Sequence, residues 1–236
     1  MNSPLTPEQL EAFRHLDACL LANAIEKFQE RLRNEGFIHN RVRCLTPHPQ
    51  AMVGYAATLK IRGSEPPTAA GVYPDRTDWW DYIVAQPAPR VLVIQDTESR
   101  SGLGALIGRV HMNILRALNC IGVVTDGSVR DLPVAQNLGF HLFAGSVSVS
   151  HAFVHIVEIG APVVIGGLRI HSGDLLHGDI HGVQSVPLAI APRVLPVAAQ
   201  IGAWKRKVIA VCQAPDFSLE KLRAVVSKEE AESQDA

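Results

Sequence analysis

Apolar residues recur at helical spacing near the start of the chain. The string Thr6-Pro7-Glu8-Gln9 has the features of a helix start, with Thr6 as N-cap, proline in the first turn and Gln9 completing a capping box. Apolar positions then fall on one helical face, and glycine at Gly36 is a residue type that ends helices (Leu10, Phe13, Leu16, Leu20, Leu21, Ala24, Ile25, Phe28). The pattern predicts one N-terminal helix between Pro7 and Gly36.

The middle of the chain alternates short apolar runs with helical patterns. The apolar runs suit buried strands and cover residues 53–61, 90–95, 121–125 and 141–144. Helical patterns occupy residues 77–86, 106–118 and 132–138, and loops are predicted at 63–74 and 97–104. This order of strands and helices predicts βαβ units with parallel pairing.

The pattern changes after Gly145. Residues 147–159, 163–170 and 183–186 resemble strands separated by Gly- and Asp-rich turns, which favours a second sheet. Helical patterns return at 194–211 and 218–228, and a polar tail covers 229–236. Without an evident repeat or linker, we expect one α/β domain over residues 1–236, with an N-terminal helix and a C-terminal helical segment at approximately 191–228.

Composition and charge narrow the class of protein. The 236 residues include 22 Lys and Arg against 23 Asp and Glu, so the formal net charge is −1 and no electrostatic signature of nucleic-acid or anionic-membrane binding is present. Hydrophobic residues make up 47%, enough for a substantial core, and the low charge suggests that part of the surface is covered in an oligomer.

The first 30 residues and the cysteines indicate the cellular compartment of the protein. Acidic residues interrupt the apolar positions near the start, unlike a signal peptide, and no stretch approaches the roughly 20 apolar residues that span a bilayer. The four cysteines are scattered without a CxxC pair, as is typical of reduced thiols, although a disulfide or thiolate site stays open (Cys19, Cys44, Cys120, Cys212). We expect a cytoplasmic protein.

The most unusual string runs GVVTDGSVRD over residues 122–131. We expect the buried strand to end at Thr125, so that two aspartates and an arginine follow at its carboxyl end, where open α/β sheets bind ligands. Asp126 or Asp131 can hold Mg²⁺, and Arg130 can bind a carboxylate through two hydrogen bonds. Alternatively, Asp126-Gly127 is a plain turn and Arg130 pairs with Asp131 at the surface; the residues alone leave both interpretations open.

A glycine-containing turn, Gly102 to Gly108, precedes a predicted helix and forms a second candidate element. Backbone N–H groups at a helix start can hold an anion. The turn lacks the Lys-Ser/Thr of a P-loop and the spacing of a dinucleotide-binding fingerprint, so it is a weak signal by itself.

The two elements together carry a family resemblance. The stretch from Gly104 to Asp131, ending in a strand followed by DG-x-x-RD, resembles the RraA-like family, named after the regulator of RNase E activity A. That family includes the class II 4-hydroxy-4-methyl-2-oxoglutarate/4-carboxy-4-hydroxy-2-oxoadipate aldolases. The resemblance covers roughly Leu16 to Pro187 and continues through PVVIGG at 162–167 and the Gly-Asp pairs that follow, which we interpret as structural turns.

The resemblance implies a three-layer swivelling β/β/α fold, built as a homotrimer or a hexamer. It implies that Asp131 is the one direct protein ligand of Mg²⁺ or Mn²⁺, and that Arg130 binds the pyruvate-like end of a small 2-oxo acid. The amides after Gly108, at Arg109, Val110 and His111, would cradle the substrate carboxylate. The expected chemistry is retro-aldol cleavage that releases pyruvate, or decarboxylation of oxaloacetate.

The chain departs from the aldolases at one position. They carry an acidic residue with 20 residues between it and the arginine, and here Arg109 occupies that place. A cation cannot act as the carboxylate that holds a water for proton transfer. The relay has moved, with Asp96, Glu98 and Asp126 as candidates, or the substrate differs, or aldolase activity is lost. The aldolases also take an acidic residue from a neighbouring subunit, which has no clear counterpart here.

Histidines suggest a rival metal site. His151 and His155 are four residues apart, with Glu158 beyond, which would suit zinc on a helix. The segment is rich in β-branched residues, and on a strand the two histidines would stand ~13 Å apart at ~3.3 Å per residue, too far to share a metal. His111 is the histidine we expect to touch substrate or move a proton, with a plain surface position as the alternative.

Three hypotheses on function therefore remain. The leading one is a divalent-metal-dependent lyase with Arg130, Asp131 and His111 as catalytic residues. The second is a non-catalytic, protein-binding regulator, which Arg109 makes more plausible. The third is an enzyme of another class, such as a hydrolase, that uses the same metal and arginine.

Overall fold

The N-terminal segment forms two helices where the apolar pattern predicted one. The computed structural model describes residues 4–39, 41–67 and 77–232. Helix α1 (Pro7–Arg14) begins with the predicted capping box, and α2 (Ala18–Glu26) begins after Asp17, whose carboxylate accepts the Leu20 N–H at 2.7 Å. Apolar residues of both helices pack into the same core cluster, which is why their spacing looked continuous. The chain leaves α2 at Lys27, so Gly36 does not end a helix.

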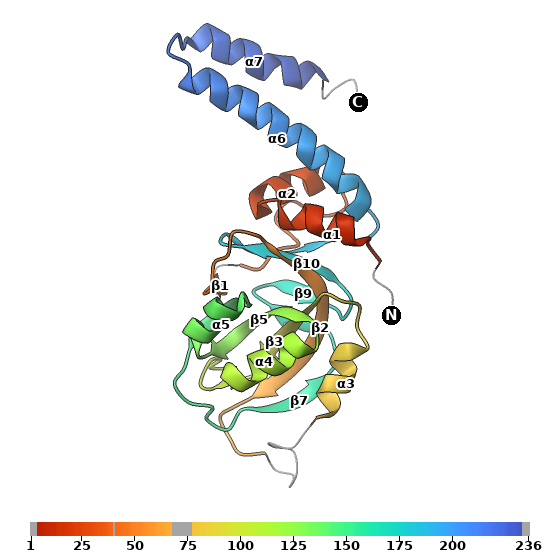
Figure 1. Cartoon of the computed structure of the whole chain (residues 1–236), viewed down its shortest axis with the longest axis vertical. Helices are drawn as coiled ribbons and strands as arrows, with labels where there is room; N and C mark the ends of the chain where they lie inside the picture. Colours follow the sequence, from red (N-terminus) through yellow and green to blue (C-terminus); the bar gives the residue numbers. More distant parts are fainter. Residues whose placement is uncertain (1–3, 40, 68–76, 233–236) are drawn as a thin grey trace.

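In the described part of the chain, nine strands form one mixed sheet around which the helices are arranged (Figure 1). Its main path runs β1-β6-β5-β3-β2-β10-β11, while β4 pairs with β5 and β7 pairs with β2. The strands are β1 (Arg43–Cys44), β2 (Met52–Arg62), β3 (Arg90–Asp96), β4 (Ala105–Ile107), β5 (Cys120–Val129), β6 (His141–Val147), β7 (His155–Ile159), β10 (Leu175–Asp179) and β11 (Gly182–Val186). The inner pairs β2-β3, β3-β5 and β5-β6 are parallel, as the alternating pattern predicted.

Short helices connect the parallel strands. Helix α3 (Asp78–Val84) precedes β3, α4 (Arg109–Ala117) lies between β4 and β5, and α5 (Leu132–Leu138) joins β5 to β6. The predicted helix 106–118 is therefore wrong at its start, because residues 105–107 pair with β5 as a strand. Helix α5 ends at Gly139 in the left-handed conformation, as expected.

Two long strands predicted after Gly145 are each interrupted. In place of one strand over 147–159, β6 ends at Val147 and β7 begins only at His155, with a loop at 148–154 between them. In place of one strand over 163–170, β8 (Val163–Ile165) and β9 (Leu168–Ile170) form a hairpin. Gly166 and Gly167 both have positive φ at its turn, a conformation that glycine adopts without strain.

The predicted second sheet is mostly absent from the described residues. Strands β7, β10 and β11 join the main sheet by antiparallel pairing, and the β8-β9 hairpin alone stands apart. Gly178 and Asp179, expected in a turn, lie within β10. The Asp179 carboxylate accepts the Ala18 N–H at 2.8 Å and so attaches α2 to the sheet, a structural role.

The C-terminal segment forms two helices, α6 (Ala191–Gln213) and α7 (Leu219–Glu232). The first half of α6 packs against α1 and α2, whereas its second half extends away from the body together with α7 (Figure 1). Residues 229–232 thus belong to α7 and not to a tail, while 233–236 and the loop positions 68–74 fall outside the described residues. Among the described helices, none combines the length and apolarity needed to cross a membrane.

Candidate functional site

A cavity of about 330 Å³ opens at the N-terminus of α4. Six of its seven lining residues are the site residues expected from the sequence, and the seventh is His151 (Gly108, Arg109, Val110, His111, Arg130, Asp131, His151). The cavity brings together residues that follow β4, β5 and β6 in the chain. The structure therefore places the expected residues around one space and adds a histidine.

Arg130 and Asp131 stand directly beyond the end of β5. That strand continues through Val129, so the expected turn at Asp126-Gly127 is wrong. Pairing of β5 with β4 and β6 carries the strand past the Asp-Gly pair. Arg130 Nε lies 3.8 Å from Asp131 Oδ2, with both side chains about one-third exposed (33% and 31%). Arg130 and Asp131 therefore pair with each other, as the alternative interpretation of the sequence expected, but they line a cavity and do not lie on a plain surface.

Asp131 has a backbone conformation that few residues other than glycine adopt, although aspartate is among the types that tolerate it. It is left-handed at φ 59° and occupies the N-cap position of α5. Its Oδ2 accepts the backbone N–H of Arg109 at 2.7 Å, which links the end of β5 to the first residue of α4. A non-glycine residue in this conformation is uncommon and often marks a functional position.

The acidic candidates for a proton relay lie elsewhere. Asp126 Oδ1 accepts the Asp96 N–H at 2.7 Å. Burial raises the pKa of Asp126 to about 6, and the nearby Asp96 charge acts in the same direction. The backbone hydrogen bonds of Asp126 lower its pKa and offset only part of this effect. Glu98 accepts bonds from Ser64 and Gly63, which lower its pKa. These carboxylates do not line the cavity.

The start of α4 supplies part of the expected anion cradle. Its N-cap, Gly108, has no side chain, and the Arg109 N–H is already bonded to Asp131. Within the described part of the chain, the amides of Val110 and His111 have no hydrogen-bond partner and remain open to a ligand. A Cβ at Gly108 would lie 2.8 Å from Arg130 Nε and 3.0 Å from Asp131 Oδ2, so glycine allows the close approach.

His111 stands on the first turn of α4. Its half-buried ring lies 6.0 Å from the ring of Trp79, centroid to centroid. Burial, followed by the electrostatic interactions with His151 and Arg130, lowers the pKa of His111 below its usual range. The lowered pKa favours the neutral ring, which can donate a hydrogen bond from one nitrogen and accept one at the other.

His151 is the residue that sequence reasoning did not place in the site. Its Nδ1 lies 2.6 Å from the Ala105 carbonyl oxygen, so Nδ1 carries the proton that this bond requires. A Cβ at Gly104 would overlap the His151 backbone, so glycine allows the 148–154 loop to approach β4. The histidine-rich composition of this region was the available signal, but a continuous strand over 147–159 would have put His151 elsewhere.

The zinc alternative finds no support in the described residues, where no group of three or more His, Cys, Asp and Glu could hold a metal ion. A hard divalent cation that keeps most of its waters has a different requirement, namely one well-placed carboxylate. Asp131 meets it, because its Oδ1 makes no hydrogen bond within the described residues. The buried Arg130 Nε also has no hydrogen-bond partner there, as expected where a ligand oxygen belongs.

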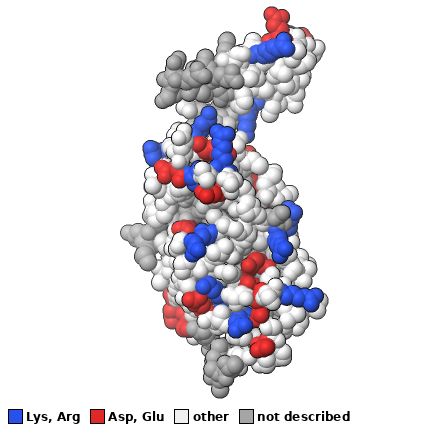
Figure 2. Space-filling model, turned by 180° about the vertical axis from the view of Figure 1, so that it is seen from behind, with Lys and Arg blue, Asp and Glu red and all other residues white. Residues whose placement is uncertain are grey.

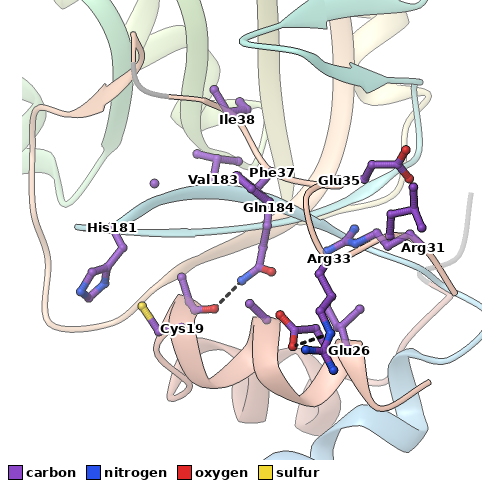
Figure 3. Close-up of a pocket in the computed structure, with 15 residues that line it drawn as sticks. Cys19, Glu26, Arg31, Arg33, Glu35, Phe37, Ile38, His181, Val183 and Gln184 are labelled. Carbon is purple, nitrogen blue, oxygen red and sulfur yellow. Dashed lines mark hydrogen bonds and ion pairs between the residues drawn. The ribbon is translucent and has the colours of Figure 1, made fainter. Parts of the chain in front are cut away.

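A second cavity, of about 270 Å³, lies between α2 and β11 (Figure 3). Its lining is mainly apolar, and both of the arginines that line it, Arg31 and Arg33, already have partners. Arg31 Nη1 donates to both the carbonyl and the hydroxyl oxygen of Ser185 at 2.9 Å, and Arg33 pairs with Glu26 at 3.6 Å. Figure 2 shows one face of the molecule, on which acidic and basic side chains are interspersed.

Comparison with known proteins agrees with the motif. The sequence model of the RraA-like family (Aldolase/RraA) matches residues 18–184. A protein of Halalkalibacterium halodurans named "Putative 4-hydroxy-4-methyl-2-oxoglutarate aldolase" is 32% identical over 95 residues, which cover 40% of this chain and 45% of that protein. An uncharacterized protein of Methanocaldococcus jannaschii is 31% identical over 88 residues, 37% of this chain and 42% of that protein. Each match therefore spans less than half of the curated relative.

Solved structures show the same fold. An uncharacterized protein from Pseudomonas syringae pv. tomato superimposes with a TM-score of 0.73 at 23% identity, covering 95% of this chain and 96% of that one. RraAS2 of Streptomyces coelicolor, described as an unusual member of the RNase ES inhibitor RraA protein family, gives a TM-score of 0.66 at 19% identity, with 86% and 96% covered. At these identities the likeness concerns the fold alone.

Proposed function

The chain belongs to the RraA-like family, and from this premise we propose that it is a divalent-metal-dependent lyase acting on a small 2-oxo acid. The family includes aldolase-like lyases as well as RNase E inhibitors, so membership alone does not choose between them. The observation that carries the proposal is the meeting of Asp131, Arg130 and the open amides of α4 in one cavity. The reaction is retro-aldol cleavage that releases pyruvate, or decarboxylation of oxaloacetate.

Each group has a distinct task in this proposal. Asp131 is the protein ligand of Mg²⁺ or Mn²⁺, which, when bound, polarises the 2-oxo group and favours the enolate. Arg130 holds the carboxylate at the pyruvate end, and the amides of Val110 and His111 bind the same anion at the positive end of the helix dipole. Arg109, exposed at the cavity edge, adds positive charge and suits a substrate with a second carboxylate.

The alternative is a non-catalytic regulator that binds another protein. The observation that favours it is Arg109, which removes the acidic residue that the resemblance leads us to expect at this position. A regulator would retain a protein partner with or without metal, whereas a lyase would turn over a small acid only with metal.

We further propose a cytoplasmic homo-oligomer, a trimer or hexamer, with no nucleic-acid or membrane partner. Exposed apolar side chains near the cavity support an interface there. Val110 lines the cavity and is 68% exposed. Val149 is 95% exposed, and its backbone carbonyl contacts Arg130. Analytical ultracentrifugation tests this, and a monomer at micromolar concentration would contradict it.

Pyruvate release from 4-hydroxy-4-methyl-2-oxoglutarate or oxaloacetate, measured with Mg²⁺ and with EDTA, tests the lyase. We expect metal-dependent turnover that is lost in Asp131→Ala. Thermal unfolding gives a second measure: Mg²⁺ at 100 times its Kd stabilises the protein by about 2.7 kcal/mol, and Asp131→Ala abolishes this shift. Glu26→Gln, in the second cavity, is the matched control and keeps both responses. Absence of turnover on both substrates would refute the lyase.

A further inference from the structure

We propose that His151 is the acid–base catalyst of the site, acting on 4-hydroxy-2-oxo acids. This inference rests on the proposed lyase function and names the group that moves the proton. It begins from Arg109, which stands where the aldolases of the family have an acid and cannot accept a proton. Another lining group must therefore take that role.

The cavity contains three side chains able to accept a proton: Asp131, His111 and His151. Asp131 accepts the Arg109 N–H and is the carboxylate assigned to the metal. His111 packs its half-buried ring beside Trp79 and shares the first turn of α4 with the amides that bind the substrate anion. It is therefore placed at the carboxylate end of the substrate, away from the bond that breaks.

His151 comes from a different element, the 148–154 loop after β6, and lines the same cavity. The bond from Nδ1–H to the Ala105 carbonyl fixes both the ring orientation and the tautomer. Nε2 is then the basic nitrogen, and it makes no hydrogen bond within the described residues. A ring held by a backbone carbonyl at one nitrogen, with the other nitrogen free, has the arrangement of a positioned general base.

Contacts with Ala105 and Arg130 hold the loop on both sides of Ser150. Ala105 donates its N–H to the Ser150 carbonyl at 3.0 Å and accepts from His151, so one strand residue binds two successive loop residues. Arg130 Nη1 also lies 3.4 Å from the Val149 carbonyl, which connects the substrate-binding arginine to the same loop. His151 is thus positioned relative to both β4 and Arg130.

The proposed step conserves atoms and electrons. Nε2 of His151 takes the proton from the hydroxyl group on C4, and the C3–C4 bond breaks as that oxygen becomes a carbonyl. The electron pair of the broken bond passes to C3 and gives the enolate of a 2-oxo acid. His151 then returns the same proton from Nε2 to C3, which yields pyruvate and a second carbonyl compound and restores the neutral ring.

Decarboxylation of oxaloacetate separates this role from the rest of the site. Loss of CO₂ leaves the same enolate, but no hydroxyl group has to be deprotonated, and the enolate can be protonated by water after release. A variant without the base should therefore lose aldol cleavage and keep decarboxylation. Loss of substrate binding or of the metal would instead reduce both reactions.

The test variant is His151→Asn, because its amide nitrogen can keep the bond to Ala105 while Nε2 is removed. His155→Asn is the matched control: His155 also bonds a backbone carbonyl through Nδ1, that of Phe153 at 2.8 Å, and it does not line the cavity. We expect His151→Asn to lower kcat for 4-hydroxy-4-methyl-2-oxoglutarate cleavage by ~10²–10⁴-fold and oxaloacetate decarboxylation by less than about threefold. His155→Asn should change neither.

A readout without metal or substrate checks the tautomer. Long-range ¹H–¹⁵N spectra at pH 8 should show His151 protonated at Nδ1 and bare at Nε2, and these signals should vanish in His151→Asn. Protonation at Nε2, equal loss of both reactions, or unchanged cleavage in His151→Asn would each overturn the role of His151. Failure of the wild-type protein to catalyse either reaction would instead refute the lyase function.

Discussion

Two of the cavities in the described part of this protein differ in how many of their polar groups make hydrogen bonds within the chain. The cavity at α4 and the cavity between α2 and β11 have similar volumes, about 330 and 270 Å³. In the second, Arg31 and Arg33 already have oxygen partners within the chain (Figure 3). In the first, the buried Arg130 Nε makes no hydrogen bond among the described residues and has only the Asp131 carboxylate 3.8 Å away, and the amides of Val110 and His111 make none there either. Unmet hydrogen-bonding capacity, and not volume, distinguishes a binding site from a hollow.

The same substitution in each cavity tests this difference most strongly. Arg130→Lys keeps the charge but loses the planar fork that binds a carboxylate, so we expect kcat/KM to fall about 100-fold, a loss of ~2.7 kcal/mol. Arg31→Lys removes two hydrogen bonds to Ser185 and should cost about 1 kcal/mol of unfolding free energy while activity is unchanged. Steady-state kinetics and urea unfolding measure the two effects. An equal fall of kcat/KM in Arg130→Lys and Arg31→Lys would contradict the assignment of function to the cavity at α4.

A pair of glycines sharpens the comparison further. In Gly108→Ala the new methyl group would crowd Arg130 and Asp131, while the backbone at φ −143° tolerates alanine. We expect roughly tenfold lower kcat/KM with unfolding free energy changed by less than about 1 kcal/mol. Gly36→Ala forces alanine to φ 85° and against the Arg31 guanidinium, so stability falls by about 1–3 kcal/mol while kcat/KM is retained. The reverse pattern would place the function in the second cavity.

The smallest effect concerns the charge state of His111. Burial is the main cause of its lowered pKa, and Arg130 contributes less. NMR titration should therefore show a midpoint below 6.5 that rises in Arg130→Gln yet stays below 6.5. Because the folded state disfavours the charged ring, the stability that neutral His111 contributes is present above pH 6.5 and is lost as pH falls toward the lower, folded-state pKa. A wild-type midpoint above 6.5 would contradict this electrostatic explanation.

Local sequence was sufficient for much of the fold. The capping box at Thr6 and the end of α5 at Gly139 follow from short-range chemistry, and the order of strands and helices along the chain predicted the parallel pairing of β3 and β5. The apolar period could not reveal the break at Asp17, because the two helices bury the same kind of face in one core cluster. Periodicity reports which face is buried, and it does not report whether the backbone is continuous.

For the site, the sequence by itself determined the chemical groups and much of their grouping. The string ending in Arg130-Asp131 and the turn before Arg109 identified six of the seven residues that line the cavity. Their shared place at the carboxyl edge of a parallel sheet follows from the order of strands and helices. The departure from the family pattern at Arg109 is likewise a property of the sequence alone.

Only the tertiary structure decided where β5 ends and which histidine joins the site. Pairing with β4 and β6 carries β5 through Asp126-Gly127, although the same residues often form a turn. In place of a predicted strand, a loop carries His151, whose imidazole bonds Ala105 across 46 residues and lines the cavity with Arg130 and Asp131. Such contacts depend on chain segments that meet only after the sheet has formed, and local propensity contains no record of them.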